Sequence, residues 1–155
     1  MAGKKHPVYE SVLVEELASE GKAICRIDQM IVFVRGAVPG DVIDIRIAKK
    51  RKRYAEAHIV QFKSYSSIRQ KPVCEHFGIC GGCKWQQLPY SEQLKAKEKQ
   101  VIDTLIHLAK IPLPPADPIM GSAKTEYYRN KLEYTFSNRR WLSREEISSG
   151  EQFTE

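Results

Sequence analysis

The sequence contains no long hydrophobic run: its longest apolar stretch, Met30 to Val34, is far too short to cross a bilayer. It also lacks the mark of a secretory signal, because residues Met1 to Pro7 are polar and basic and no apolar stretch follows them. These two absences predict a cytoplasmic protein that does not bind a membrane.

Cysteine is scarce, with four residues in 155. Because thiols stay reduced in the cytoplasm, cysteines there are more typical of metal ligands or core residues than of disulfides. Positive charge is in excess, since 25 lysines and arginines face 19 aspartates and glutamates, a formal net charge of +6. That excess suits a polyanionic partner, but a basic protein without a nucleic-acid role can have the same total, so the distribution of charge must decide.

The first part of the chain is rich in β-branched residues, and their near-alternation predicts consecutive short strands. Val38-Pro39-Gly40-Asp41 separates the third strand from the fourth, and proline followed by glycine is typical of a type II turn. Several strands with no helix among them predict a small closed barrel of the OB-like kind. The five expected strands are 8–17, 23–27, 30–34, 42–48 and 54–62.

A polar linker at 64–71 and a cysteine-containing segment at 72–85 follow the barrel. Apolar residues then recur at helical spacing, which predicts one amphipathic helix from Pro89 to Lys110, ended by Pro112. A last strand is expected over Tyr127 to Ser137, and residues 143–155 offer no apolar run to pack. We therefore expect a mainly β chain with three parts. These are a barrel at 1–63, a cysteine loop and helix at 64–111, and the start of an α+β domain at 112–155.

Cys74, Cys80 and Cys83 form a C-x5-C-x2-C pattern among glycines. The short spacing lets the sulfurs share one inorganic centre, and glycines let the loop point backbone N–H groups at them. Burial as small core residues is the alternative, but glycine-rich loops do not usually bury thiols for packing. Spacing alone leaves two metals open: zinc with His76 as the fourth ligand, or an iron–sulfur cluster. Cys25 lies in a predicted strand and is expected to fill the core.

Five consecutive cations occupy the junction between the fourth and fifth predicted strands, directly before Tyr54. Such charges repel one another unless an anion is near, so RNA phosphates are the expected partner, although a solvated hairpin tip is the alternative. A second candidate begins at Tyr127, where aromatic residues adjoin cations and an amide; an amphipathic strand with Tyr128 inside is its alternative. The predicted RNA-binding residues are Lys49, Lys50, Arg51, Lys52, Arg53, Tyr54, Arg129, Asn130 and Lys131.

Taken in order, these elements resemble the amino-terminal part of the RNA (uracil-5-)-methyltransferases, in the branch that acts on 23S ribosomal RNA. The most specific match is the cysteine run from Cys74 to Gln86 with Leu88-Pro89-Tyr90 after it, which looks like that family's iron–sulfur segment. Tyr128-Arg129-Asn130-Lys131 resembles the start of its central RNA-contacting domain. Residues 8–63 look like its TRAM domain, notably at Gly21-Lys22-Ala23, Val32-Phe33-Val34, Gly36-Ala37 and Val38-Pro39-Gly40-Asp41.

The resemblance implies a 4Fe–4S cluster held by Cys74, Cys80 and Cys83. The family's fourth cysteine comes later, and no cysteine follows Cys83 here. For the intact enzyme it implies S-adenosylmethionine-dependent methylation at C5 of uracil, in which a cysteine first adds to C6. The cofactor loop and catalytic residues of that reaction have no counterpart in this sequence. We therefore expect a monomeric, inactive, RNA-binding piece with no catalytic residue. A zinc-binding module that binds RNA or protein without enzyme activity is the alternative.

Overall fold

The structure, a computed structural model, forms two compact units, Met1–Gly121 and Ser122–Glu155. Within the described part of the chain, no helix is long and apolar enough to span a membrane. The residues that the structure describes are 7–110, 112–128, 133, 136–140, 142 and 144–151.

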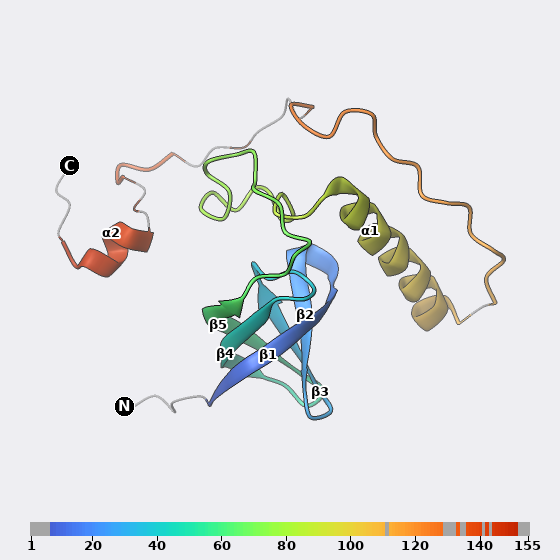
Figure 1. Cartoon of the computed structure of the whole chain (residues 1–155), viewed down its shortest axis with the longest axis horizontal. Helices are drawn as coiled ribbons and strands as arrows, with labels where there is room; N and C mark the ends of the chain where they lie inside the picture. The colour runs from blue at the N-terminus through green and yellow to red at the C-terminus, as the bar shows by residue number, and fades with distance from the viewer. Residues whose placement is uncertain are drawn as a thin grey trace. The chain divides into compact units, whose positions relative to one another are not determined.

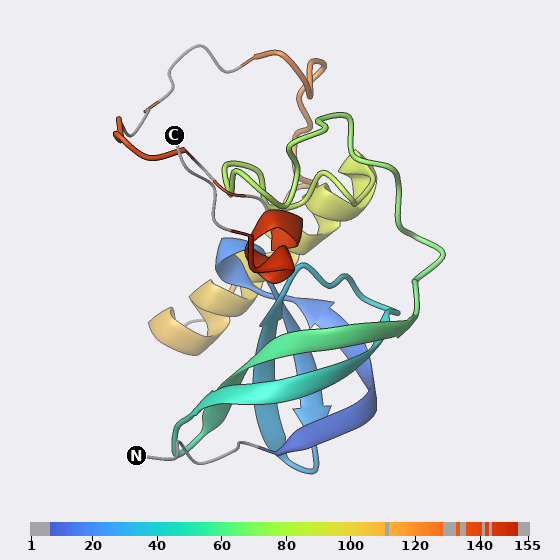
Figure 2. The same cartoon turned by 90° about the vertical axis from the view of Figure 1, so that its left-hand side faces the viewer.

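Five strands close into a barrel in the order β1-β2-β3-β5-β4, with β1 paired to β4 (Figure 1 and Figure 2). All neighbouring strands are antiparallel except β3 and β5, which run parallel. The predicted five-stranded barrel is confirmed, and the predicted strand ends differ from the observed ones by at most two residues. The strands are β1 (Val8–Leu17), β2 (Lys22–Ile27), β3 (Met30–Arg35), β4 (Val42–Lys50) and β5 (Tyr54–Ser64).

Small and β-branched side chains fill the barrel, because alternate residues of each strand point inward. In the β2–β3 pair, Cys25 lies opposite Val32 and Ala23 opposite Val34, and all four are buried. The alternate, outward positions of these two strands hold both charged and apolar residues, among them Arg26 and Phe33. The remaining buried core residues of the barrel are Val14, Ala37, Ile43, Ile45, Ile47, Ala55 and Ala57.

The turn before β4 has the predicted type II character. Gly40 has φ of +87°, and the backbone N–H of Asp41 donates to the carbonyl of Val38 at 3.1 Å. A short 3-10 turn, η1 (Ser19–Gly21), joins β1 to β2. The cationic run lies at a different connection, in the β4–β5 hairpin.

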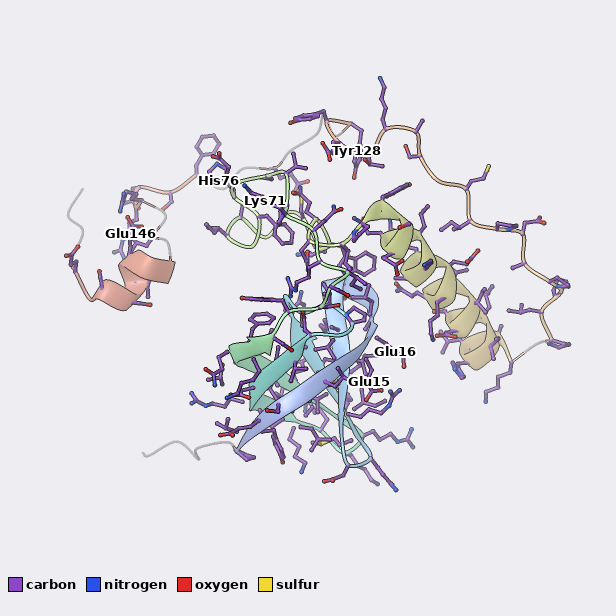
Figure 3. The ribbon with its side chains drawn as sticks, in the orientation of Figure 1. Glu15, Glu16, Lys71, His76, Tyr128 and Glu146 are labelled. Carbon is purple, nitrogen blue, oxygen red and sulfur yellow. The ribbon has the colours of Figure 1, made fainter. Side chains whose placement is uncertain are left out.

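The expected helix is present as α1 (Tyr90–Thr104), continued by a π-helical stretch, η2 (Leu105–Ala109), and ended where Lys110 adopts a left-handed conformation. It makes a salt bridge to the barrel: Lys99 Nζ lies 3.3 Å from the carboxylate of Glu16 on β1, and Glu16 points toward α1 in Figure 3. No residue of α1 or η2 is fully buried: in the apolar stripe predicted for this helix, Leu94 and Ile102 are half-buried, while Val101, Leu105 and Leu108 are exposed.

The second unit differs from expectation. The predicted strand over 127–137 is wrong where the structure describes it, because Tyr128 and Phe136 lie outside any strand and are 72% and 97% exposed. Alternating residues form a strand only when another strand pairs with them, and none of the described residues does so here. A short helix, α2 (Arg144–Ser149), occupies the polar end, where no element was predicted.

Candidate RNA-binding surface and cysteine loop

The cationic loop, Lys49 to Arg53, comprises the last two residues of β4 and the three-residue turn that leads into β5. The turn is closed by a hydrogen bond from the backbone N–H of Arg51 to the carbonyl of Tyr54 at 2.8 Å. All five side chains are exposed. Among the carboxylates that the structure describes, none forms a salt bridge with them, so their charges are available to an anion. The predicted placement is therefore confirmed, while RNA binding by these residues stays a prediction.

An aromatic pair lies beside this loop on the outer face of the barrel. Tyr54 opens β5 and remains 38% exposed, and its ring meets that of Phe33 on β3 edge to face, with centroids 5.7 Å apart. Lys22 Nζ lies 5.8 Å from the centroid of the Phe33 ring. Sequence reasoning did not single out Phe33 or Lys22 as neighbours of Tyr54. Phe33 carried a signal, since an aromatic ring between two inward-facing valines must point outward.

The cysteine loop, residues 72–85, consists of tight turns. The N–H of Phe77 donates to the carbonyl of Cys74 at 3.1 Å, and the N–H of Cys80 donates to that of His76 at 3.2 Å. Gly78 has φ of +85°, which lets the chain reverse between the first two cysteines. Figure 3 labels His76, which lies in this loop, and Lys71, which directly precedes it.

Two of its sulfur atoms accept hydrogen bonds. Cys83 Sγ accepts from Gln86 Nε2 at 3.2 Å, and Cys80 Sγ accepts from the backbone N–H of Gly82 at 3.5 Å. Gln86 also accepts from the backbone N–H of Cys74 at 3.1 Å, so one side chain connects the first and last cysteines. N–H donors directed at sulfur stabilise thiolate ligands of a metal, so the chemistry of this loop fits a sulfur-bound centre.

The candidate ligands of the cysteine loop are not arranged as a metal site. Over the described ranges, no three histidine, cysteine, aspartate or glutamate side chains lie close enough together to hold one metal ion. Neither Cys74, Cys80 and Cys83 nor that set with His76 is gathered into a ligand sphere. Both metal predictions therefore remain untested.

Cys25 is separate from the loop and sits in the barrel core, fully buried. Burial, with a smaller contribution from the negative charge of Glu15, raises the pKa of the Cys25 thiol to about 12. A thiol with so high a pKa is a poor metal ligand or nucleophile at neutral pH. The prediction that Cys25 fills the core is confirmed.

The linker after β5 is fixed to the barrel by a buried ion pair. The Asp41 carboxylate is fully buried and accepts hydrogen bonds from Arg69 Nε at 2.8 Å and Arg69 Nη2 at 2.6 Å. It also accepts from the backbone N–H groups of Ser66 at 2.9 Å and Val38 at 2.7 Å. Burial raises the pKa of Asp41, but these hydrogen bonds outweigh it and hold the pKa below its ordinary value. We call Asp41, Ser66 and Arg69 the linker clamp.

The two ends of the cysteine loop are also joined to each other and packed on the barrel. The N–H of Gln70 donates to the carbonyl of Gln87 at 2.9 Å, and Leu88 is fully buried. A Cβ atom at Gly21, on the barrel, would stand only 2.6 Å from Lys84 Cβ. The loop therefore starts from a defined base rather than from a free tether.

The second predicted RNA-contact region is described only in part by the structure. Arg129, Asn130 and Lys131 lie outside the described residues. Tyr127 and Tyr128 are both highly exposed, so the alternative of Tyr128 packed inside a strand is wrong. RNA contact by this segment stays a prediction.

The barrel and its outer surface have a known counterpart. A profile of the TRAM domain matches residues 9–60, which run from the start of β1 into β5. This part of the chain is therefore a TRAM domain, as the sequence motifs indicated.

Relatives extend the likeness beyond the barrel. An "uncharacterized RNA methyltransferase" of Bacteroides thetaiotaomicron is 56% identical over 131 residues, which are 84% of this chain and 29% of that protein. One of Porphyromonas gingivalis is 52% identical over 86% of this chain and 29% of its own length. A 23S rRNA (uracil(1939)-C(5))-methyltransferase of Cupriavidus metallidurans is 35% identical over 78% of this chain and 28% of its own length.

The chain is thus related over most of its length to RNA methyltransferases, and the resemblance seen in its sequence is confirmed. It spans less than a third of the length of these relatives.

Proposed function

We propose that this chain is the RNA-gripping amino-terminal part of an S-adenosylmethionine-dependent 23S rRNA (uracil-5-)-methyltransferase. The observation that carries the proposal is the cationic loop, five exposed charges without a described carboxylate partner, on a TRAM domain shared with RNA methyltransferases. The chain supplies no catalytic residue. S-adenosylmethionine and the uracil-methylating residues belong to polypeptide outside the sequence described here.

The loop contributes by neutralising phosphates. Lysine and arginine that replace condensed counterions on RNA release those ions, so affinity falls as salt rises. The closed barrel holds the loop in one place, which lets it position flanking RNA while a target uridine is drawn out of its stack elsewhere. We further propose that the protein acts as a cytoplasmic monomer, with light scattering on the purified chain as the test of its oligomeric state.

The test is a titration of the 155-residue chain with ribosomal RNA fragments at several salt concentrations. Exchanging two loop cations, Lys50→Glu with Arg51→Glu, should weaken binding and reduce the log–log salt slope by about 1.4 to 1.8. Lys95→Glu with Lys97→Glu on α1 is the matched control, because both pairs lower the net charge from +6 to +2. Binding that is absent, insensitive to salt, or weakened equally by both pairs contradicts the proposal.

For the cysteine loop we propose a 4Fe–4S cluster with Cys74, Cys80 and Cys83 as ligands and a fourth ligand from outside the loop. Its support is the spacing, the glycine turns and the N–H donors at two sulfurs. When bound, the cluster would serve as a structural staple rather than an electron carrier. The loop would have to close around it, and the linker clamp and the joined loop ends give it a fixed base for doing so.

A zinc site with His76 as the fourth ligand is the second candidate, favoured by the exposure of His76 on the same loop as the cysteines. Metal analysis of protein purified without oxygen distinguishes the two. Iron with sulfide, lost in Cys83→Ala and kept in His76→Ala, supports the cluster. Zinc lost in both variants supports the Cys3His site. Cys25→Ala should keep either metal, and wild-type protein with neither would reject both candidates.

A further inference from the structure

Tyr54 and Phe33 are placed where a nucleic acid on the cationic loop would pass over them. Tyr54 follows directly on Arg53, and β5 pairs in parallel with β3 so that Ile31 lies opposite Tyr54 and Phe33 opposite Glu56. The two rings are thus diagonal neighbours on one outer face of the barrel. Their edge-to-face contact, with an angle of 73° between the planes, is a favourable arrangement for aromatic pairs.

Phe33 is held firmly, and it in turn sets the direction of Tyr54. The neighbours of Phe33 in the chain, Val32 and Val34, are both buried in the core and fix the strand beneath it. Lys22 Nζ lies 5.8 Å from its ring centroid, within the range of a cation–π contact. Tyr54, at the start of β5, keeps 38% of its surface exposed.

Charge divides this surface into two zones. Lys22 Nζ lies 3.4 Å from Glu20 and 3.6 Å from Glu56, and Arg35 Nη2 lies 3.8 Å from Glu20. Two cations and two carboxylates thus balance around the aromatic rings. The adjoining cationic loop is less balanced: Lys49 lies opposite Glu56 in the β4–β5 pair, but none of its five cations forms a salt bridge with a described carboxylate. A neutral aromatic zone beside a positive zone matches the two halves of an unpaired nucleotide, its base and its phosphate.

We infer that Tyr54 is a stacking platform for an unpaired RNA base, with Phe33 as the residue that positions its ring. The ligand of this surface is therefore single-stranded RNA rather than a duplex, because base pairing and stacking hide the base faces that Tyr54 would cover. This inference rests on the proposed RNA-binding function and narrows its substrate class. It adds Phe33, as the residue that positions the Tyr54 ring, to the residues that decide affinity.

The experiment uses the 155-residue chain and an unstructured oligouridine that carries 2-aminopurine at successive positions, with a duplex RNA of equal length beside it. Tyr54→Leu should weaken single-strand binding by about 5- to 150-fold and abolish the quenching of 2-aminopurine that stacking causes. Tyr54→Phe, which keeps the ring, should retain both affinity and quenching. Phe33→Leu should give an intermediate loss, and the salt slope should stay unchanged in all three, since no cation is removed.

Thermal unfolding of each variant is the control that checks whether the barrel remains folded. The inference is overturned if Tyr54→Leu binds and quenches like wild type, or if wild type binds the duplex as tightly as the single strand. In both cases salt-dependent RNA binding by the cationic loop would persist, so the proposed function would stand. If wild type bound no RNA at all, the proposed function and this inference would fall together.

Discussion

At the scale of single residues, the four cysteines show how environment decides the chemistry of one side chain. Cys25 is enclosed by the barrel core, and burial raises the pKa of its thiol to about 12. Cys80 and Cys83 are exposed on a loop of tight turns, and both sulfurs accept hydrogen bonds from nitrogen. Burial disfavours the thiolate of Cys25, whereas the sulfurs of Cys80 and Cys83 lie open to solvent and to reagents.

The cysteines should accordingly separate by reactivity in metal-free protein. Alkylation at pH 8 with iodoacetamide, followed by peptide mass spectrometry, should modify Cys80 and Cys83 within minutes and leave Cys25 unmodified. Cys25 should react only after denaturant exposes the core. Equal rates for Cys25 and Cys83 in the folded protein would show that the barrel does not protect its interior thiol.

Between elements, the linker clamp sets where the cysteine loop starts. Arg69 meets the Asp41 carboxylate through two nitrogen atoms, and its guanidinium also lies 5.1 Å from the ring centroid of Phe62 and 5.2 Å from that of Tyr65. A further hydrogen bond goes from Arg69 Nη2 to the carbonyl of Gly36 at 2.9 Å. The side chain is thus surrounded by its partners, and the residues after β5 cannot swing freely.

The clamp predicts a dependence of stability on pH. Because the pKa of Asp41 is lower in the folded than in the unfolded chain, its contribution is complete above about pH 4 and is lost as pH falls through the folded-state pKa. Asp41→Asn should lower the free energy of unfolding at pH 7 by about 3 kcal/mol and weaken its fall in acid. Urea unfolding at pH 7 and pH 3 measures both. Glu92→Gln, which removes the exposed ion pair with Lys95, should change stability little and serves as control.

The contact between the barrel and the cysteine loop can be tested at two glycines that both have positive φ. Gly21 and Gly36 have φ of +72° and +84°, but only at Gly21 would a Cβ atom meet Lys84. Gly36→Ala should lower the free energy of unfolding by about 1 kcal/mol, because alanine is disfavoured in a left-handed backbone conformation. Gly21→Ala should lower the free energy of unfolding by more than Gly36→Ala does. It should also speed hydrogen exchange in the cysteine loop, because Lys84 must move to make room for the added Cβ atom. Equal effects of the two substitutions on the loop would show that it does not pack on Gly21.

At the scale of the whole molecule, the buried core and the longest run of positive charge lie in the same stretch of the chain, one inside the barrel and the other on its surface. Every buried residue in the described part of the chain lies between Val14 and Leu88. The cationic loop alone carries five positive charges against a formal total of +6. The core determines the fold, while the charge determines what the fold attracts.

The compact unit Met1–Gly121 should therefore fold by itself. Protein shortened to residues 1–121 should give the same far-ultraviolet signature of strands and a thermal midpoint close to that of the 155-residue chain. Circular dichroism during heating provides the measurement. A large fall in the midpoint would mean that residues 122–155 support the barrel.

Sequence alone determined a good part of this protein. Alternation of β-branched residues located the five strands, and proline followed by glycine located the turn before β4. Cysteine spacing and the cationic run marked two sites, because each lies within a few consecutive residues. The predicted strand at 127–137 shows the limit of such patterns: alternation describes the two faces of a strand but not whether another strand is available to pair with it.

Tertiary structure decided which distant residues meet. Three contacts have no local signature in the chain: the parallel pairing of β3 with β5, the ion pair of Asp41 with Arg69, which is 28 positions further on, and the contact of Phe33 with Tyr54. Periodicity tells which face of a strand is inward, whereas barrel closure brings particular outward side chains together. The aromatic pair beside the cationic loop, and with it the inferred preference for unpaired bases, exists only because the barrel closes.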